Sequence, residues 1–520
     1  MMWTLALLST ATAADVTLEP GSSIQDAIND AAAGDTITLS AGTYEEDLST
    51  ETHGTAEAPI TLTAAEDADV IITASGEVLQ VDHAYWIIEG ITFDGQYGNA
   101  DTLDIGDAAN HTRLENIEVR NSARDCIDMG APQGIQISNS SIHHCLYFDT
   151  DDGERLDAHG ITGGAVRDLR IENTDIHTFS GDAIQFDAGR AAPGWNDIHI
   201  EGCRFWLEPL DEDTAGFLVG QVTGENAVDT KTWNEADEAN LTIVDTEAWG
   251  FKNGLDISNQ AAFLFKENVK VTLKRVRVHD SEIAFRLRGP TSARPKGATV
   301  HMENILVYGV DVGIRYEDEL NSLTIWHATF GSGIGTLFQE ADSESTDPNI
   351  QNSLFLIDVL PEEVDTDQAN LLASNEDFVD ADEGDHRLVE TSNAIDAGTT
   401  ISGISTDIDG LDRVVGPAPD VGAHEYGVVV VPDTGDADTG ESGEEDGDGG
   451  GGPDEPDDTA APTDDREDVG GIGAAEQVGE KGGCGCSTQP IKKSPFALVL
   501  LLALGIARRR KKNSTAQRTA

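Results

Sequence analysis

The sequence predicts an all-β solenoid, a right-handed parallel β-helix, and three observations lead to this fold class. A six-residue pattern, apolar-x-(Asn/Gly/Asp)-x-x-apolar, recurs nine times, and successive copies start 23 to 43 residues apart. Such short, repeated, β-rich units indicate a solenoid. β-Branched residues dominate the copies, and apolar positions alternate with polar ones, as in strands that bury one face. The copies are IEGITF (88–93), LENIEV (114–119), ISNSSI (137–142), IENTDI (171–176), IEGCRF (200–205), IVDTEA (243–248), LKRVRV (273–278), MENILV (302–307) and IWHATF (325–330).

The N-terminal segment predicts export. Residues 1–14 hold an apolar run that ends in the small-residue stretch Ala11–Ala14, as in a secretory signal peptide. We expect the β-helix to cover residues 15–390. An amphipathic, alanine-rich segment, Ser23–Ala33, predicts a short helix that caps its first coil.

Each copy is followed by a second strand, and the spacing between the two predicts where loops are inserted. A matching apolar residue follows most copies after 12 or 13 residues: Leu114→Ile127, Ile171→Ile184, Ile243→Leu255, Leu273→Phe285, Met302→Ile314 and Ile325→Leu337. Two gaps are longer, 24 residues for Ile137→Ile161 and 28 for Ile200→Val228. Leu146–Gly160 and Leu207–Asn226 should therefore be neighbouring loops on one face, where solenoids often bind ligands.

Alternation along these second strands predicts two outward-facing columns of side chains. The first column is Asp128, Thr162, Gln185, Asp229, Asp256, Arg286 and Arg315, and the second is Gly130, Gly164, Asp187, Lys231, Ser258, Arg288 and Glu317. Stacked strands lie about 4.8 Å apart, so these groups should form one strip with carboxylates in its lower half and cations in its upper half. We interpret the strip as a functional site; the alternative is a surface salt-bridge ladder.

The net charge limits the partners of the chain. The sequence holds 32 Lys and Arg against 96 Asp and Glu, a net charge of −64. This field repels phosphate backbones, so we expect no nucleic-acid binding. An acidic polysaccharide could bind only through cations or a local basic patch.

The C-terminal part predicts a stalk and an anchor. Residues 391–427 should close the solenoid, and residues 428–482, rich in Gly, Asp, Glu and Pro, should form an acidic disordered stalk. Residues 483–520 contain Cys484 and Cys486, an apolar run at Pro495–Ala507 and a basic end. This arrangement resembles the C-terminal sorting tag of myxobacterial surface proteins. The resemblance implies processing at one of the two cysteines and retention at the cell surface, on the outer-membrane side.

The other three cysteines, Cys126, Cys145 and Cys203, are too few and too scattered for a disulfide framework. We expect core thiols with at most one bridge.

Several motifs resemble right-handed β-helix proteins of the pectate lyase and chondroitinase-B-like class. Gly54–Leu62 after Ala41–Tyr44 looks like their opening, and Ser180–Gln185 and Glu225–Lys231 look like their coil motifs. Asn393–Gly398, Asp407–Gly410 and Asp420–Glu425 are similar to a closing module that often precedes a surface anchor.

The resemblance implies a polysaccharide lyase that removes the proton next to a uronate carboxylate and eliminates the 4-linked sugar. Such a reaction needs the carboxylate charge neutralised, by Ca²⁺ or by arginine, and a basic side chain as general base. The candidate calcium ligands are Asp187, Asp229 and Asp256. Lys231 is the candidate base, with His159 as the alternative.

Arg286 and Arg288 are the candidates for pairing with the uronate.

Two other functions stay open. A polygalacturonase-type hydrolase would use a carboxylate pair taken from the three aspartates, and a non-catalytic glycan-binding or adhesive protein would use exposed rings near the loops. The ring candidates are Trp195, Trp206, Trp233 and Trp249. We expect a monomer that binds a polysaccharide or cell-surface glycan and a membrane through its tag.

Overall fold

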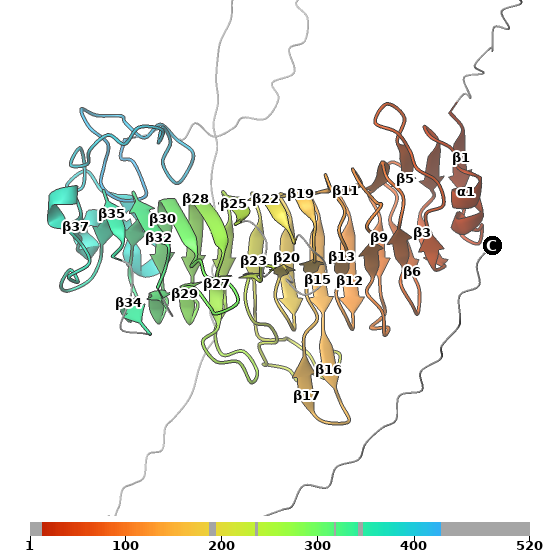
Figure 1. Ribbon diagram of the computed structural model, residues 1–520, viewed down its shortest axis with the longest axis horizontal. Coiled ribbons are helices and arrows are strands. Elements are labelled where there is room, and N and C mark those ends of the chain that lie inside the picture. The colour runs from red at the N-terminus through yellow and green to blue at the C-terminus, as the bar shows by residue number, and fades with distance from the viewer. Residues whose placement is uncertain (1–12, 187–193, 234–237, 317–318, 342–346, 428–520) are drawn as a thin grey trace, which may run out of the picture. The chain divides into compact units, whose positions relative to one another are not determined.

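The computed structural model describes residues 13–186, 194–233, 238–316, 319–341 and 347–427. In this part the chain coils into a parallel β-helix whose strands stack along its long axis from β1 to β37 (Figure 1). The coil is right-handed, the sense that parallel crossover connections nearly always take. The predicted solenoid is confirmed for these residues.

Each coil contributes to three columns of parallel strands, called columns A, B and C. Columns A and B form one 24-stranded sheet and share the long strands β28 (Val269–His279) and β30 (Thr299–Tyr308), whereas column C is a separate 11-stranded sheet. The other strands of column A are β1 (Asp15–Leu18), β2 (Thr36–Leu39), β5 (Ile60–Ala64), β8 (Trp86–Glu89), β11 (Arg113–Glu115), β14 (Gln136–Ser138), β19 (Arg167–Glu172), β22 (Asn196–Glu201), β25 (Ala239–Val244), β32 (Ser322–Trp326) and β35 (Asn349–Gln351).

Columns B and C follow in each coil. Column B continues with β3 (Gly42–Glu45), β6 (Val70–Thr73), β9 (Thr92–Asp94), β12 (Glu118–Ser122), β15 (Ser141–Cys145), β20 (Asp175–Phe179), β23 (Arg204–Trp206), β26 (Glu247–Trp249), β33 (Thr329–Phe330), β36 (Leu354–Phe355) and β37 (Leu371–Leu372). Column C consists of β4 (Leu48–Ser49), β7 (Leu79–Val81), β10 (Leu103–Ile105), β13 (Ile127–Met129), β18 (Ile161–Gly163), β21 (Ile184–Phe186), β24 (Val228–Thr230), β27 (Ala261–Phe265), β29 (Ile283–Leu287), β31 (Val312–Tyr316) and β34 (Thr336–Glu340).

The repeated six-residue pattern is the corner between columns A and B, not one continuous strand. In all nine copies the third residue has a positive φ, between 48° and 71°. Asn, Asp and Gly tolerate this left-handed conformation best, which explains why they fill seven of the nine positions. The apolar residues on either side point inward from two different columns and join the continuous core.

The N-terminal end is capped by the predicted helix, which is shorter than expected. α1 covers Ile24–Asp30, and Ser23 Oγ accepts a hydrogen bond from the backbone N–H of Asp26 at its first turn. Ile24 and Ile28 are fully buried, so the helix covers the end of the core.

Cys126 and Cys145 form one disulfide between column C and the end of β15, whereas Cys203 is a buried free thiol. The prediction of at most one bridge among these three cysteines is confirmed.

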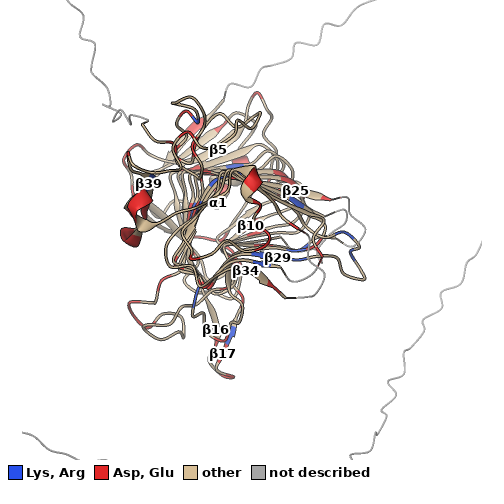
Figure 2. Cartoon of the chain, turned by 90° about the vertical axis from the view of Figure 1, so that its left-hand side faces the viewer, with Lys and Arg blue, Asp and Glu red and all other residues tan. Residues whose placement is uncertain are grey.

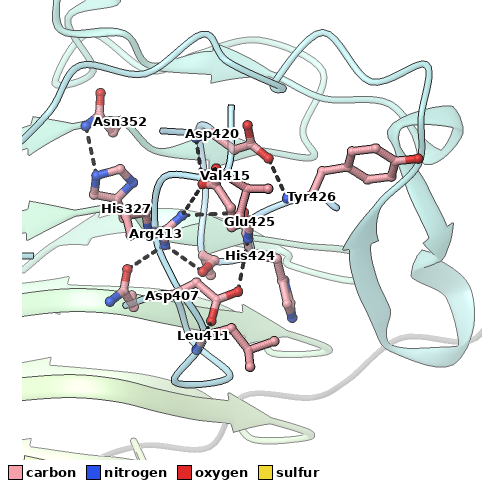
Figure 3. Close-up of polar contacts among 12 residues, drawn as sticks. His327, Asn352, Asp407, Leu411, Arg413, Val415, Asp420, His424, Glu425 and Tyr426 are labelled. Carbon is pink, nitrogen blue, oxygen red and sulfur yellow. Dashed lines mark hydrogen bonds and ion pairs between the residues drawn. The ribbon is translucent and has the colours of Figure 1, made fainter. Parts of the chain in front are cut away.

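The last described segment folds back on the solenoid around a buried guanidinium (Figure 3). It follows three 3₁₀ turns, Thr366–Gln368, Asn375–Asp377 and Ala381–Glu383, and the antiparallel hairpin of β38 (Phe378–Asp380) and β39 (Asp385–Leu388). Arg413 Nη2 donates to Asn304 Oδ1 (2.6 Å) and to the carbonyl of Ala423 (2.7 Å). Ile408 and Ala423 pack against Leu306 of β30. The segment therefore ties itself to column B.

The predicted stalk and sorting tag, residues 428–520, and nearly all of the predicted signal peptide lie outside the described residues. No helix in the described ranges has the length and apolarity needed to cross a membrane.

Candidate functional site

The predicted strip exists on column C. Its first outward column runs, in matched register, through Gln80, Asp104, Asp128, Thr162, Gln185, Asp229, Leu264, Arg286, Arg315 and Gln339. Carboxylates occupy its lower half and guanidinium groups its upper half, as predicted. Figure 2 shows the basic positions along β29 on a body marked mainly by acidic residues.

The prediction that Asp256 belongs to this column is wrong. Asp256 is exposed, has a φ of 58° and lies in a loop between β26 and β27. The strand that fills its place is Ala261–Phe265, with Leu264 in the column. Spacing misled the prediction because Leu255 is an apolar residue of the loop that packs against other loops.

The corrected strand adds a second lysine, Lys266, which sequence spacing had missed. The Nζ of Lys266 lies 2.7 Å from Asp229 Oδ2, and the Nζ of Lys231 lies 3.5 Å from the same oxygen. The Asp229 side chain is only 4% exposed, whereas Lys231 is 36% and Lys266 is 18% exposed. Two ammonium groups from successive coils thus meet over one buried carboxylate, and Lys231 is the more accessible of them.

Arginines extend this positive region along the next coils. Arg286 Nη1 donates to the carbonyl of Asn259 (3.3 Å), and Arg315 Nη1 donates to the side-chain oxygen of the same residue. Arg294, in the loop after β29, donates from Nε to the carbonyl of Thr232 (2.7 Å). We call the following set the basic patch: Lys231, Lys266, Arg286, Arg288, Arg294 and Arg315.

A buried carboxyl lies below the basic patch. Asp182 is fully buried, and its two oxygens accept from Gln185 Nε2 and Asn226 Nδ2, each at 2.7 Å. Burial, and then the charge of Asp229, raise the pKa of Asp182 above its usual value. This network fixes the base of the strip between β21 and β24.

His159, the alternative base, lies two residues before β18 and has its ring tautomer set by a backbone contact. The backbone N–H of Asp182 donates to His159 Nδ1 (2.9 Å). Burial lowers the pKa of His159, so the ring is neutral and carries its proton on Nε2. In that state His159 donates a hydrogen bond from Nε2, and a base role for that atom does not fit.

The predicted calcium ligands are not brought together by the described residues. Asp187 lies outside them, Asp256 is in the wrong place, and Asp229 Oδ2 already faces two ammonium groups. The described ranges contain no group of three or more His, Cys, Asp or Glu side chains able to hold a metal ion. The described members of this donor set, Asp229 and Asp256, do not form a Ca²⁺ site, because Ca²⁺ prefers six to eight oxygen ligands.

Two predicted loops lie side by side next to the strip, and this prediction is confirmed. The first forms a hairpin of β16 (Tyr147–Asp149) and β17 (Glu154–Leu156), which projects from the body in Figure 1. Phe148 of this hairpin lies 5.1 Å, centroid to centroid, from Phe217 of the second loop. Leu255 of the unpredicted third loop packs into the same small cluster.

Arg155 fastens the hairpin to the solenoid. Its Nη2 lies 2.5 Å from Glu225 Oε1, and its Nη1 contacts Asp157 (2.9 Å) and the carbonyl of Ser180.

Three of the four tryptophans predicted to be exposed, Trp195, Trp206 and Trp249, do not present free ring faces to a glycan. Trp195 is buried, and its Nε1 donates to the carbonyl of Lys231 (2.9 Å). Trp233, just beyond Lys231, is half-buried. Trp206 and Trp249 stack on each other, 5.0 Å apart and within 3° of parallel. They belong to a ring stack on column B formed by His143, His177, Trp206, Trp249, His279 and Tyr308.

Like charges lie close together in the lower half of the strip, where Asp104 is paired in register with Asp128. Burial, and then the neighbouring Asp128, raise the pKa of Asp104 to about 6. The folded chain therefore holds this proton more tightly than the unfolded chain, whose carboxyl has a pKa near 3.8. Stability is fully present below the unfolded pKa and is lost as the pH rises through about 6.

We therefore expect Asp104→Asn, which mimics the protonated carboxyl, to raise the melting temperature at pH 7 and to leave it nearly unchanged at pH 4. The gain should be about 1 kcal/mol or less, because Asp104 is half-exposed and solvent screens its charge. Thermal unfolding at the two pH values measures it. An equal shift at both values would show that like-charge repulsion is not the cause.

Comparison with known proteins gives a family match over one part of the chain. The chondroitinase B family model matches residues 19–124, which end before β13 and the basic patch. No curated protein matches the chain.

Solved structures align over longer ranges. The pectate lyase Pel9A is 16% identical, with a TM-score of 0.42, over 80% of this chain and 97% of its own. An alginate lyase from Paenibacillus sp. str. FPU-7 is 16% identical, with a TM-score of 0.40, over 65% and 97%. A polygalacturonase from Erwinia carotovora ssp. carotovora is 15% identical, with a TM-score of 0.39, over 68% and 98%.

Proposed function

We propose that this chain is an exported, surface-anchored polysaccharide lyase that cleaves uronate-containing glycans by β-elimination at the basic patch. One observation carries the proposal: Lys231 and Lys266 meet over Asp229 on a chain whose net charge is −64. A local cluster of cations on so acidic a body favours an anionic ligand. The disulfide Cys126–Cys145 supports export, because such bonds persist in oxidising compartments.

Each cation has a role in the proposed reaction. Arg286 and Arg288, on the coil above Lys266, would pair with the uronate carboxylate and neutralise its charge. Lys231, the more exposed lysine, would take the proton from the carbon next to that carboxylate while its amine is unprotonated. The carbon–hydrogen bond breaks, a carbon–carbon double bond forms, and the bond to the 4-linked oxygen breaks. The leaving oxygen then takes a proton from the lysine or from water.

Lys266 would keep the charge of Asp229 balanced throughout, because its Nζ stays 2.7 Å from that carboxylate. The proposal assigns the proton transfer and the charge neutralisation to these side chains.

A screen of uronate polymers tests the proposal. A lyase releases unsaturated products that absorb in the ultraviolet, a hydrolase releases only reducing ends, and a binding protein releases neither. We expect ultraviolet-absorbing products and no loss of rate with a chelator. Binding without turnover would favour the glycan-binding alternative, which the same basic patch supports.

We also propose that the C-terminal tag attaches the protein, as a monomer, to the cell surface. Deletion of Ile491–Ala520 is expected to release the protein into the medium, because the apolar run and the basic end are removed together. Immunoblots of cell and medium fractions measure the release. A deletion variant that stays with the cells would contradict the proposed anchor, and the full-length chain is the control.

A further inference from the structure

Lys231 lies just beyond the part of β24 that a backbone ladder joins to the next coil. The last residues paired between β24 and β27 are Asp229 and Leu264. Past them, the backbone N–H of Lys266 donates to the side-chain hydroxyl of Thr230 (2.8 Å), so a side chain takes the place of a ladder carbonyl. The ladder to the coil above therefore ends before Lys231, and the position of this residue depends on other contacts.

An indole holds the main chain of Lys231 from one side. Trp195 Nε1 donates to the carbonyl of Lys231 (2.9 Å). Trp195 is only 2% exposed, and its ring packs on that of Phe186, with the two centroids 4.6 Å apart. The backbone N–H of Lys231 donates to the carbonyl of the same Phe186 (2.9 Å). The main chain before and after the Lys231 side chain is thus tied to one packed pair of aromatic residues.

A guanidinium group holds the next carbonyl from the other side. Arg294 Nε donates to the carbonyl of Thr232 (2.7 Å), and its Nη1 lies 3.5 Å from Glu267 Oε1. The hydroxyl of Thr232 donates to the backbone carbonyl of Glu267 (3.0 Å). Thr232 is 2% exposed and Glu267 is 6% exposed, so water competes little for these contacts. Arg294 therefore closes a triangle with Thr232 and Glu267 directly after Lys231.

The loop that carries Arg294 reaches across two coils. It lies between β29 and β30, yet Arg294 contacts the end of the strand segment that begins with β24, about 10 Å away along the solenoid. Thr291 and Arg294 exchange backbone hydrogen bonds of 2.8 and 3.2 Å, and the Arg294 N–H also bonds to Thr291 Oγ1 (3.1 Å). Pro290 and Pro295 flank this turn and restrict its backbone. The turn therefore presents Arg294 from a restrained backbone.

We propose that Trp195 and Arg294 are positioning residues, which together fix the place of Lys231 in the basic patch. The inference rests on the proposed function, in which Lys231 is the general base. Two carbonyls held from opposite sides leave the main chain at Lys231 little freedom, so the amine stays near Asp229 Oδ2, 3.5 Å away. Misplacing a reacting group by about 1 Å costs on the order of 100-fold in rate.

Trp195→Phe tests the first contact, because it removes the indole N–H and keeps a ring against Phe186. We expect kcat on a uronate polymer to fall by about 10- to 100-fold and KM to change little, since the base moves and the substrate contacts stay. Trp86→Phe is the matched control: Trp86 of β8 is 1% exposed, and its Nε1 donates to the carbonyl of Thr52 (2.9 Å). Both variants should lower Tm by similar amounts, and only Trp195→Phe should lower kcat.

Arg294→Lys tests the second contact and separates position from charge. A lysine keeps a positive charge opposite Glu267 but lacks the planar Nε donor that meets the carbonyl of Thr232. We expect kcat to fall about tenfold with KM nearly unchanged. A raised KM with wild-type kcat would mean that Arg294 contributes to substrate binding, and would overturn its positioning role.

The chemical reactivity of the Lys231 amine tests the same inference without any substrate. Amine labelling of the full-length chain, followed by mass spectrometry of its peptides, compares Lys231 with Lys274, whose side chains are 36% and 37% exposed. We expect Trp195→Phe to raise the labelling rate of Lys231 relative to Lys274 by about threefold or more, because a less restrained side chain meets the reagent more often. Trp86→Phe should leave this ratio unchanged.

The two measurements distinguish a failed inference from a failed function. Wild-type kcat in both Trp195→Phe and Arg294→Lys would overturn the positioning role and leave the lyase in place. Faster labelling of Lys231 in a chain that cleaves no uronate polymer would refute the lyase but not the restraint on Lys231. An equal loss of kcat in Trp86→Phe and Trp195→Phe would identify lost stability as the cause, and would also overturn the inference.

Discussion

Lys231→Ala is expected to lower kcat/KM on a uronate polymer by on the order of 100- to 10,000-fold, the usual contribution of a general base. The amine is the only part of the proposed chemistry that this change removes, because Lys266 still balances Asp229 at 2.7 Å. Stability should change by less than about 1 kcal/mol, since the lysine is partly exposed and its ion pair is 3.5 Å long. Initial rates of ultraviolet absorbance and thermal unfolding provide the two measurements.

Lys274→Ala is the matched control for this variant. Lys274 is 37% exposed, close to the 36% of Lys231, and pairs with Glu303 on column A. It should keep wild-type activity. If Lys231→Ala also kept its activity, the base would have to lie elsewhere; if it lost glycan binding in a chain without turnover, the basic patch would be a binding site only.

The solenoid and the strip could be predicted because both follow from spacing. A period-two alternation determines which side chains face outward, and parallel stacking brings equivalent positions together. Asp128, Asp229 and Arg286 therefore fell into one column from sequence alone, as the register confirms. Even the corner conformation had a signal in the Asn, Asp and Gly of the third position.

Spacing failed where a loop carried an apolar residue at the expected distance. Leu255 stands 12 residues after Ile243, yet Phe263 is the residue that pairs with Val228 in column C. Phe263, not Leu255, takes the strand position because it pairs with Val228 of the neighbouring coil. The sequence of a single coil does not show this contact. This single error placed Asp256 in the predicted strip and left Lys266 out of it.

The ring stack had a signal that was missed. In six successive copies the residue directly after the six-residue pattern is His, Trp or Tyr: His143, His177, Trp206, Trp249, His279 and Tyr308. In matched register these rings must lie one above another, so their faces cover each other. The tautomer of His159 had no such signal, because it depends on a backbone N–H 23 residues away.

Arg413→Met is expected to destabilise the C-terminal end of the solenoid by about 3–5 kcal/mol, the usual result of removing one partner from a buried charge network. Arg413 is 1% exposed and lies among Asp407, Asp420 and Glu425 (Figure 3). Burial lowers its pKa to about 10, so the guanidinium stays charged at neutral pH. Without it, the buried carboxylates lose their only described cation within the network, and burial already raises the pKa of Glu425 to about 7.

The loss should therefore be larger at pH 8 than at pH 5, where Glu425 is protonated in the folded chain and the network carries less negative charge. Thermal unfolding and hydrogen exchange at β30 and β36 measure it, since Arg413 Nη2 bonds to Asn304 of β30. Arg387→Met is the control: Arg387 is 61% exposed, pairs with Asp385 in the same region, and should cost less than about 1 kcal/mol. Similar losses in both variants would mean that the closing segment is held by its apolar contacts, with Arg413 as a bystander.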